Sequence, residues 1–203
     1  MITVVDLGIC NIGSLVKAFR SLGTELHLTK SHQDIRAASK ILLPGVGAFA
    51  AGMEAIRKYD LYEPLREAAL QRRIPLLGIC LGMQLLTRIS FEHGRHEGLG
   101  IVAADVVALD IDICKVVPHM GWNNLESSAG NALFKGLSDK PDFYFVHSYH
   151  VVGIPHDVVV NTCDYHMPVV ASFACRNIFG TQFHPEKSQK NGLAVLRNFL
   201  EYA

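Results

Sequence analysis

The fold is decided by one stretch, Ile74-Pro75-Leu76-Leu77-Gly78-Ile79-Cys80-Leu81-Gly82-Met83-Gln84-Leu85-Leu86, which predicts a buried strand running directly into a helix. Residues 74–79 are a short apolar run with a proline near its start, as strands tolerate. Residues 81–89 have the apolar spacing of a helix. Between them, the pattern Gly78-x-Cys80-x-Gly82 predicts a strained strand-to-helix turn that presents the cysteine. We expect this turn at the carboxyl edge of a parallel sheet, where α/β folds bind ligands.

The segments on either side repeat the alternation of strand and helix. Strands are predicted at residues 2–5, 26–28 and 40–43, and helices at 14–22 and 50–71, the second helix with a break at Pro64. This alternation predicts a mostly parallel sheet with helices on both faces. In the second half, residues 99–117 and 143–173 predict short, partly antiparallel strands, and residues 192–202 a final helix. We expect one α/β domain spanning residues 1–203.

The composition limits the kinds of partner. The 203 residues carry no formal net charge, 49% of them are hydrophobic, and five are cysteines. Without a basic excess to hold a phosphate backbone, we expect no nucleic-acid partner. No apolar window reaches the roughly 18 residues of a membrane helix, and the N-terminus lacks the features of a signal peptide. An odd number of cysteines without a C-x-x-C pair predicts reduced thiols in the cytoplasm, with no disulfide framework, no metal site and no cofactor.

Cys80 is the candidate nucleophile. The flanking glycines, Gly78 and Gly82, let neighbouring backbone approach the elbow closely. The alternative is a small buried hydrophobic side chain, which is the commonest role of a free cysteine. The other cysteines lack the elbow context and are predicted to be structural. They are Cys10, Cys114, Cys163 and Cys175.

A candidate base lies in the stretch Phe179-Gly180-Thr181-Gln182-Phe183-His184-Pro185-Glu186. In an extended chain, residues two apart point the same way, and Pro185 keeps the segment extended, so His184 and Glu186 are expected on one face. Glu186 would orient one ring nitrogen of His184 and leave the other facing Cys80, which is the arrangement of a catalytic triad. The alternative is a packed histidine beside a solvated glutamate.

Acyl transfer through a thioester also needs donors for an oxyanion, each typically worth about 3–4 kcal/mol. One natural donor is the N–H after the nucleophile, at Leu81. The second is expected from the loop Gly45-Val46-Gly47, where Val46 and Gly47 are the candidates. A plain turn is the alternative. The two glycines would also permit a loop that switches between conformations.

Several motifs resemble those of known proteins. Gly78-Ile79-Cys80-Leu81-Gly82-Met83-Gln84-Leu85-Leu86, Leu43-Pro44-Gly45-Val46-Gly47 and Gln182-Phe183-His184-Pro185-Glu186-Lys187-Ser188 resemble the class I glutamine amidotransferases. Within that class, Pro118-His119-Met120-Gly121-Trp122-Asn123 and Tyr144-Phe145-Val146-His147-Ser148-Tyr149 are similar to the HisH family, the glutaminase subunits of imidazole glycerol phosphate synthase. The resemblance covers essentially the whole chain. It implies a flavodoxin-like fold that hydrolyses glutamine with Cys80, His184 and Glu186 as the triad.

The same resemblance implies further roles. The residues implied to hold glutamine are Gln84 and Glu92 at its head, and Ser148, Tyr149 and the loop at Gly47 along the rest. Ammonia would pass through a channel into a (β/α)8 cyclase partner of the HisF type, in a heterodimer of histidine biosynthesis. The residues that fall at the partner interface are Asn11, Trp122, Tyr144 and Lys187.

Two segments depart from the HisH pattern and leave other functions open. Residues 6–11 lack the usual tyrosine and glycine pattern, and residues 164–168 carry His-Met-Pro where a glycine is commoner. These details also resemble HisH paralogues of surface-polysaccharide synthesis, whose ammonia makes an amidino sugar on a related partner. Two alternatives come from other classes. A stand-alone cysteine hydrolase would turn over small esters, and a non-catalytic scaffold protein would form no thioester on Cys80.

Overall fold

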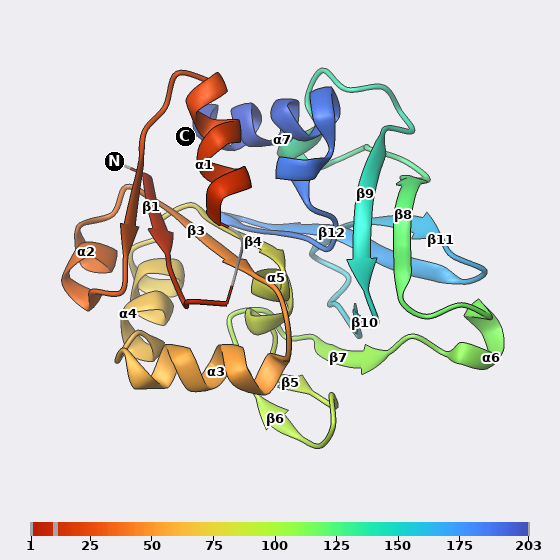
Figure 1. Ribbon diagram of the computed structural model, residues 1–203, viewed down its shortest axis with the longest axis horizontal. Coiled ribbons are helices and arrows are strands. Elements are labelled where there is room, and N and C mark those ends of the chain that lie inside the picture. The colour runs from red at the N-terminus through yellow and green to blue at the C-terminus, as the bar shows by residue number, and fades with distance from the viewer. Residues whose placement is uncertain (1, 10–11, 203) are drawn as a thin grey trace.

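A central sheet of seven strands organises the chain, in a computed structural model that describes residues 2–9 and 12–202 (Figure 1). In spatial order its strands are β11 (Val159–Asp164), β12 (Pro168–Cys175), β13 (Ile178–Thr181), β4 (Leu76–Cys80), β3 (Lys40–Gly45), β1 (Ile2–Val5) and β2 (Leu26–Thr29). The five strands from β13 to β2 are parallel, and β11 and β12 extend the sheet in antiparallel pairing. The order β2-β1-β3-β4 is that of flavodoxin-like sheets. The predicted fold class is therefore confirmed.

Helices cover both faces of this sheet (Figure 1). One face carries α1 (Ile12–Ser21), α7 (Gln189–Glu201) and the short 3₁₀ turn η2 (Ala132–Phe134). The other face carries α2 (His32–Ala37), α3 (Phe49–Lys58), α4 (Tyr62–Arg66), the π-helical turn η1 (Glu67–Gln71) and α5 (Leu81–Leu85). This layering is the one that alternating strands and helices predict.

Two smaller sheets lie beside the central one. A four-stranded sheet contains β10 (Tyr149–Val152), β7 (Asp105–Ala108), β5 (Ile89–Ser90) and β6 (His96–Glu97), and a two-stranded antiparallel sheet contains β8 (His119–Asn124) and β9 (Asp142–His147). The short α6 (Ile111–Cys114) and the 3₁₀ turn η3 (Pro185–Lys187) complete the chain. The predicted antiparallel strands of the second half are therefore present.

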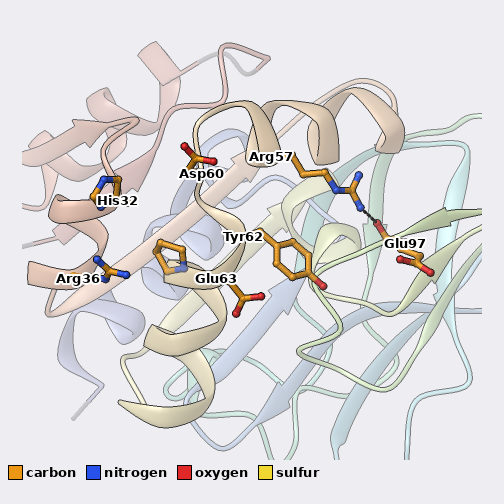
Figure 2. Close-up of a pocket in the computed structure, with 8 residues that line it drawn as sticks. His32, Arg36, Arg57, Asp60, Tyr62, Glu63 and Glu97 are labelled. Carbon is orange, nitrogen blue, oxygen red and sulfur yellow. Dashed lines mark hydrogen bonds between the residues drawn. The ribbon is translucent and has the colours of Figure 1, made fainter.

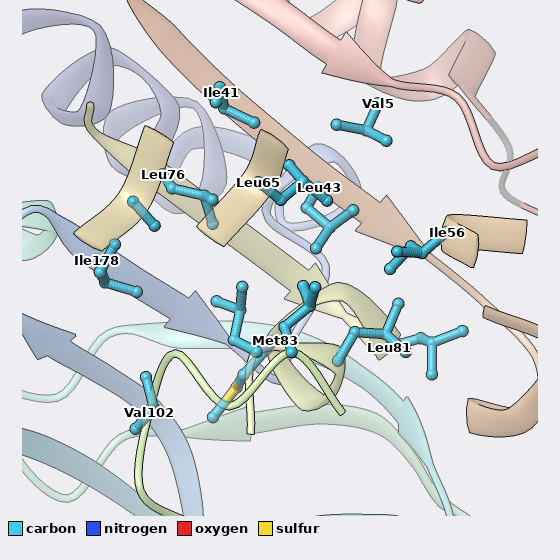
Figure 3. Close-up of a cluster of buried hydrophobic side chains, with 14 of the residues drawn as sticks. Val5, Ile41, Leu43, Ile56, Leu65, Leu76, Leu81, Met83, Val102 and Ile178 are labelled. Carbon is cyan, nitrogen blue, oxygen red and sulfur yellow. The ribbon is translucent and has the colours of Figure 1, made fainter. Parts of the chain in front are cut away.

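The side chains of β3 show how the sheet separates two cores. Ile41 and Leu43 pack into the cluster on the α3 and α4 face, whereas Leu42 packs into the cluster on the α1 and α7 face. Figure 3 shows Leu43 in the first cluster, together with Leu76 and Leu65. Each such leucine is fully buried, which stabilises the fold by about 1.5–3 kcal/mol per side chain. The carboxyl ends of the central strands are therefore held by packing on both faces.

The helix predicted at residues 81–89 is wrong in length, because α5 ends at Leu85. The N–H of Leu99 donates to the Leu85 carbonyl, and the N–H of Val102 donates to the Leu86 carbonyl, each at 2.9 Å. A continuing helix would need these same carbonyl oxygens. The chain instead turns into β5.

Two other predicted helices differ in their bounds. The helix predicted at residues 50–71 is interrupted between α3 and α4, whereas α4 runs directly into η1. The break falls at Asp60, whose φ of 53° ends α3, rather than at Pro64. The final helix begins at Gln189, ahead of the predicted residue 192. A left-handed residue ends a helix because it cannot continue the hydrogen-bond ladder.

Candidate active site

Cys80 is the last residue of β4 and stands on a strained turn. Its φ and ψ are 54° and −111°, a backbone conformation that residues with a side chain rarely adopt and that costs about 1–3 kcal/mol. The flanking glycines are required by close approach. A Cβ on Gly82 would lie 1.6 Å from the Leu43 carbonyl oxygen, and one on Gly78 would lie 2.7 Å from the Gly82 carbonyl oxygen. The elbow thus fixes the thiol at the carboxyl edge of the sheet.

His184 follows β13, the strand that pairs with β4, and bonds to Glu186. Its Nδ1 lies 2.8 Å from Glu186 Oε1. The predicted contact is present, but the predicted extended segment is wrong, because Pro185–Lys187 form the 3₁₀ turn η3. The backbone on both sides is anchored: His184 N donates to the Tyr144 carbonyl at 2.9 Å, and Ser188 Oγ donates to the His184 carbonyl at 2.6 Å. The ring orientation is therefore fixed.

The protonation of His184 is set by its two acidic neighbours. Burial by itself lowers the pKa of His184, but interactions with Cys80 and then Glu186 raise this pKa to about 10. Both neighbours therefore favour the protonated imidazole, whose Nε2 is buried without a hydrogen-bond partner among the described residues. A thiolate beside an imidazolium is the activated state of a cysteine nucleophile.

The Cys80 sulfur has two further polar neighbours. Its Sγ lies 3.9 Å from the Val146 carbonyl oxygen, to which the thiol donates, and 3.7 Å from Gln182 Nε2, which donates to the sulfur. Gln182 is fully buried and was not predicted as a site residue. The signal for it was its place in the motif two residues before His184. Its N–H points at the atom that must carry negative charge during the reaction.

Two of the three residues predicted to supply oxyanion donors, Leu81 and Val46, differ in their present state. The N–H of Leu81 directly follows Cys80 at the start of α5. The N–H of Val46 donates instead to the Ile9 carbonyl at 3.1 Å, so in this conformation it does not serve the cavity. Gly47 beside it has a φ of 97°, which glycine adopts without strain. Turning the Val46 amide toward the cavity therefore requires a change in this loop.

A cavity of about 530 Å³ opens on Cys80. All of the residues predicted to bind glutamine line it: Gly47, Gln84, Glu92, Ser148 and Tyr149. Gln84 Nε2 already donates to the Tyr149 carbonyl and to Gln182 Oε1, both at 3.0 Å, so its Oε1 is the atom left for a ligand. Glu92 Oε2 accepts from the N–H of Phe49 at 2.6 Å, which holds this carboxylate at the start of α3.

A larger cavity of about 690 Å³ lies elsewhere, between α2, α3 and α4 (Figure 2). Its lining carries charges of both signs and consists of His32, Arg36, Arg57, Asp60, Tyr62, Glu63, Pro64 and Glu97. Arg57 Nη2 donates to the Glu97 carbonyl at 3.4 Å across its rim (Figure 2). None of these lining residues is a cysteine or a predicted site residue. The smaller cavity is therefore the one that opens on the candidate nucleophile, Cys80.

Three of the four residues predicted at a partner interface lie together. Trp122 on β8 pairs with Tyr144 on β9, and their rings meet edge to face with centroids 6.1 Å apart. Lys187 Nζ lies 5.9 Å from the Tyr144 ring centroid. Trp122 is 46% exposed, and an exposed tryptophan with an aromatic neighbour is typical of interfaces. Asn11 lies outside the described residues.

The other described cysteines are free thiols away from the elbow. Burial, and then the charge of Glu126, raises the pKa of Cys163 to about 12, and burial likewise raises the pKa of Cys114. Thiols with raised pKa values are poor nucleophiles. Cys175 is partly exposed, and Cys10 lies outside the described residues.

Within residues 2–9 and 12–202, no group of three or more His, Cys, Asp or Glu side chains is arranged to hold a metal ion. In the same part of the chain, no helix has the length and apolar character to cross a membrane.

A flavodoxin-like sheet that presents a cysteine elbow beside a histidine–carboxylate pair is the arrangement expected of an enzyme with a cysteine nucleophile. The family described as glutamine amidotransferase class-I matches residues 3–203. The chain therefore belongs to the class I glutamine amidotransferases, and its sequence relatives narrow the family further.

Those relatives are HisH subunits matched over their whole length. The chain is 42% identical to imidazole glycerol phosphate synthase subunit HisH 1 of Parasynechococcus marenigrum, over 100% of this chain and 98% of the relative. It is 44% identical to subunit HisH of Moorella thermoacetica, over 98% and 94%. It is 40% identical to subunit HisH 2 of Pseudomonas aeruginosa, over 99% of each. The resemblance inferred from the motifs is confirmed.

Solved structures agree on the fold. A crystal structure of a glutamine amidotransferase matches with a TM-score of 0.78 at 17% identity, covering 98% of this chain and 97% of that chain. The crystal structure of a glutamine amidotransferase from Thermotoga maritima matches with a TM-score of 0.65 at 19% identity, covering 98% and 80%. At these identities the likeness concerns the fold alone.

Proposed function

We propose that the protein is the glutaminase subunit of imidazole glycerol phosphate synthase. It hydrolyses glutamine to glutamate and ammonia through a thioester on Cys80, and passes the ammonia to a HisF-type (β/α)8 cyclase subunit in a heterodimer of histidine biosynthesis. The observation that carries the proposal is the strained Cys80 elbow, which opens on a cavity of about 530 Å³ beside the buried His184–Glu186 pair. The full-length identity to HisH subunits supports this choice of partner.

In the first half of the reaction, Cys80 is acylated. His184 holds the proton that leaves the thiol, and the thiolate attacks the carboxamide carbon of glutamine, which forms the C–S bond and a tetrahedral oxyanion. The imidazolium then donates its Nε2 proton to the departing nitrogen. The C–N bond breaks, ammonia leaves uncharged, and the thioester remains.

In the second half, water cleaves the thioester. His184 Nε2 accepts a proton from the water that attacks the thioester carbon. The C–S bond breaks, glutamate leaves, and the sulfur regains its thiol proton. Glu186 stays ionised throughout and stabilises the imidazolium, as in other triads.

Glutamine is held by oxygen atoms that remain available in the cavity. Gln84 Oε1 and Glu92 Oε1 accept hydrogen bonds from its α-ammonium group, since the other polar atoms of these side chains are already bonded. Ser148 and Tyr149 line the remaining wall.

The oxyanion loop gives a reason for dependence on the partner. While the Val46 N–H donates to the Ile9 carbonyl, this candidate donor is missing from the oxyanion site. A missing donor of this kind lowers kcat by about 100- to 1,000-fold. Binding of the cyclase and its nucleotide substrate is proposed to release this amide, so the isolated chain is expected to be slow.

Ammonia is proposed to leave the active site past His184 and Glu186. A cavity of about 20 Å³, lined by His184, Glu186 and Lys187 among others, has room for about one water-sized molecule. Lys187 lies against the ring of Tyr144, and both residues are expected at the partner interface. We assign the reaction to the cytoplasm, where the free thiols of the described cysteines would remain reduced.

A second candidate function keeps the chemistry and changes the partner. The segment 164–168, which departs from the HisH pattern, contacts the strand that carries Trp122: Asn123 Nδ2 donates to the Asp164 carbonyl at 2.8 Å. A departure at the expected interface favours a different cyclase-like partner, such as the sugar amidotransferase of surface-polysaccharide synthesis.

The test is ammonia release from glutamine by wild type and Cys80→Ala, each alone and with the HisF-type cyclase and its nucleotide substrate. We expect wild type to be slow alone, stimulated at least about 100-fold by the loaded cyclase, and silent as Cys80→Ala. Turnover that depends on Cys80 but ignores this cyclase would shift the proposal to the polysaccharide partner.

Two further outcomes would contradict the proposal. Turnover of small esters without turnover of glutamine would indicate a stand-alone cysteine hydrolase. Absence of a glutamyl thioester on Cys80, sought by mass spectrometry of the acid-quenched complex, would indicate a scaffold protein.

A further inference from the structure

Two buried histidines form a pair behind the wall of the Cys80 cavity. His119 on β8 is directly opposite His147 on β9, and His119 Nδ1 lies 3.1 Å from His147 Nε2. The His119 ring stacks on Phe145 and Tyr165, with centroids 4.6 and 4.0 Å away, so these two rings cover its opposite faces. His147 lines the cavity itself. Packing fixes the pair, and the reaction described above uses neither ring.

The hydrogen bonds of this pair have one consistent polarity. His147 Nδ1 lies 2.9 Å from the Tyr149 carbonyl oxygen, which can only accept, so this nitrogen carries the proton. In a neutral ring His147 Nε2 is then an acceptor, and His119 Nδ1 must donate to it. His119 Nε2 in turn accepts from Asn123 Nδ2 at 3.2 Å. Both histidines are therefore neutral Nδ1–H tautomers.

From Tyr149 the chain of hydrogen bonds continues to the nucleophile. The Tyr149 carbonyl accepts a second hydrogen bond, from Gln84 Nε2 at 3.0 Å. The same nitrogen donates to Gln182 Oε1 at 3.0 Å, and Gln182 Nε2 donates to the Cys80 sulfur at 3.7 Å. Because Gln84 Nε2 has two protons and both are used, the direction in which Gln84 Oε1 points is fixed. The imidazole pair and the glutamine-binding wall therefore belong to one network.

A positive charge on either ring would break this network, because both nitrogens of an imidazolium donate. On a protonated His147, Nε2–H would face the His119 Nδ1–H across 3.1 Å. On a protonated His119, Nε2–H would face the amide donor of Asn123 across 3.2 Å. Burial lowers the pKa of His119 to about 4. Burial, and then the charge of His119, lowers the pKa of His147 to about 3, although the bond to Tyr149 opposes this shift. The other titratable groups that act on His147 are His150 and His184, whose charges also disfavour its protonation.

We propose that His119 and His147 are positioning residues for glutamine, an inference that rests on the function proposed above. The two neutral imidazoles fix the Tyr149 carbonyl and, through it, the Gln84 side chain whose Oε1 faces the substrate. Asn123 sets the tautomer of His119 from the outer end, where its second Nδ2 proton is held by the Asp164 carbonyl at 2.8 Å. The role proposed for both histidines is to hold these groups in place, with no proton exchanged with glutamine.

The kinetic test compares three variants in complex with the partner. His119→Phe keeps the aromatic stack but removes the donor to His147, and we expect KM for glutamine to rise about fivefold while kcat changes less than twofold. His119→Asn restores an N–H donor close to the position of Nδ1, and we expect KM to return to within about twofold of wild type. A merely structural role would not give this rescue.

The matched control is His150→Phe. His150 is also buried, on the strand that begins at Tyr149, and its Nδ1 has no partner among the described residues. We expect its KM to stay within about twofold of wild type. Equal KM changes in His150→Phe and His119→Phe, or an unchanged KM in His119→Phe, would overturn the proposal.

A second measurement needs no variant to fold and no glutaminase activity. Long-range ¹H–¹⁵N correlation spectra of the wild-type protein, labelled at its histidines, distinguish the two neutral tautomers and the imidazolium. We expect His119 and His147 to be Nδ1–H tautomers at pH 7 and to remain neutral at pH 6. An Nε2–H tautomer or an imidazolium at either position would overturn the inference. If the wild-type complex has no glutaminase activity, that result contradicts only the proposed function.

Discussion

Glu186 acts on His184 through one carboxylate oxygen. Its Oε1 lies 2.8 Å from His184 Nδ1, whereas its Oε2 is buried without a partner among the described residues. A carboxylate removed from water acts more strongly on the ring beside it than a solvated one would. Glu186 therefore orients the imidazole and favours its charged form without touching the substrate.

Glu186→Gln keeps the side-chain size and removes the charge. We expect the pKa of His184 to fall and kcat to drop about 100-fold with a smaller change in KM, because the proton donor to the departing nitrogen is then less often charged. The measurement is kcat against pH for the complex. Glu54→Gln, an exposed carboxylate on α3, is the control and should retain kcat within about twofold. Equal losses of kcat in the two variants would show that the effect comes from removing any carboxylate charge, and not from the contact between Glu186 and His184.

The junction of β4 and α5 is the element that most constrains the site. The two elements approach so closely that a Cβ on Gly82 would overlap the Leu43 carbonyl of the neighbouring strand. A backbone carbonyl cannot move away as a side chain can. The position of Cys80 therefore depends on residues that carry no chemistry of their own.

Gly82→Ala tests that dependence. We expect the free energy of unfolding to fall by about 3 kcal/mol or more, since the added Cβ would sit 1.6 Å from a backbone oxygen. The control is Gly52→Ala in α3, where the Cβ would meet the flexible Leu85 side chain at 3.0 Å and a change within about 1 kcal/mol is expected. Urea unfolding of both variants, with its midpoint and slope, measures these changes in the free energy of unfolding. A Gly82→Ala protein as stable as Gly52→Ala would mean that the junction opens readily.

Strands β8 and β9 carry Trp122 and Tyr144, the aromatic pair proposed for the partner interface. Trp122→Ala is expected to weaken binding of the (β/α)8 partner about 30-fold, or about 2 kcal/mol, as central aromatic residues of interfaces do. Titration calorimetry measures this affinity. Leu28→Ala is the control: Leu28 is 44% exposed on β2, at the far edge of the sheet from β8 (Figure 1). A Trp122→Ala protein that binds as tightly as Leu28→Ala would remove these strands from the interface.

Local patterns predicted the parallel half of the chain better than the site. The strands at residues 40–43 and 74–79 were predictable because continuous apolar runs bounded by glycine and proline leave few other structures. The length of α5 was not, since the bonds that end it come from residues beyond a separate hairpin. The turn at Pro185–Lys187 was missed because Ser188 bonds back to His184. Sequence spacing also gives no sign that β8 and β9 bring two distant histidines together.

Across the whole molecule, its buried histidines give stability opposite dependences on pH. The pKa values of His119 and His147 are lowered to about 4 and about 3, so the unfolded chain binds their protons first and stability is lost as pH falls below about 6.5. The pKa of His184 is raised to about 10, so its contribution is full below about 6.5 and is lost as pH rises toward 10. Stability should therefore be greatest near neutral pH.

The histidine pair contributes to the loss of stability at acidic pH, together with His150, whose pKa burial also lowers. Between pH 7 and pH 5, we expect the free energy of unfolding of wild type to fall by roughly 2 kcal/mol for each of the two groups. His119→Phe removes one of them and should show a shallower slope, measured by urea unfolding at each pH. If its slope equals that of wild type, the pair is not neutral in the folded protein.

The strained backbone at Cys80 allows a variant without activity to differ in thermal stability according to the residue that replaces the cysteine. Glycine would adopt the φ of 54° without cost, so Cys80→Gly should melt at a higher temperature than Cys80→Ala although both are chemically dead. The glycine form, unable to form a thioester, is the natural choice for trapping intact glutamine in crystals of the complex.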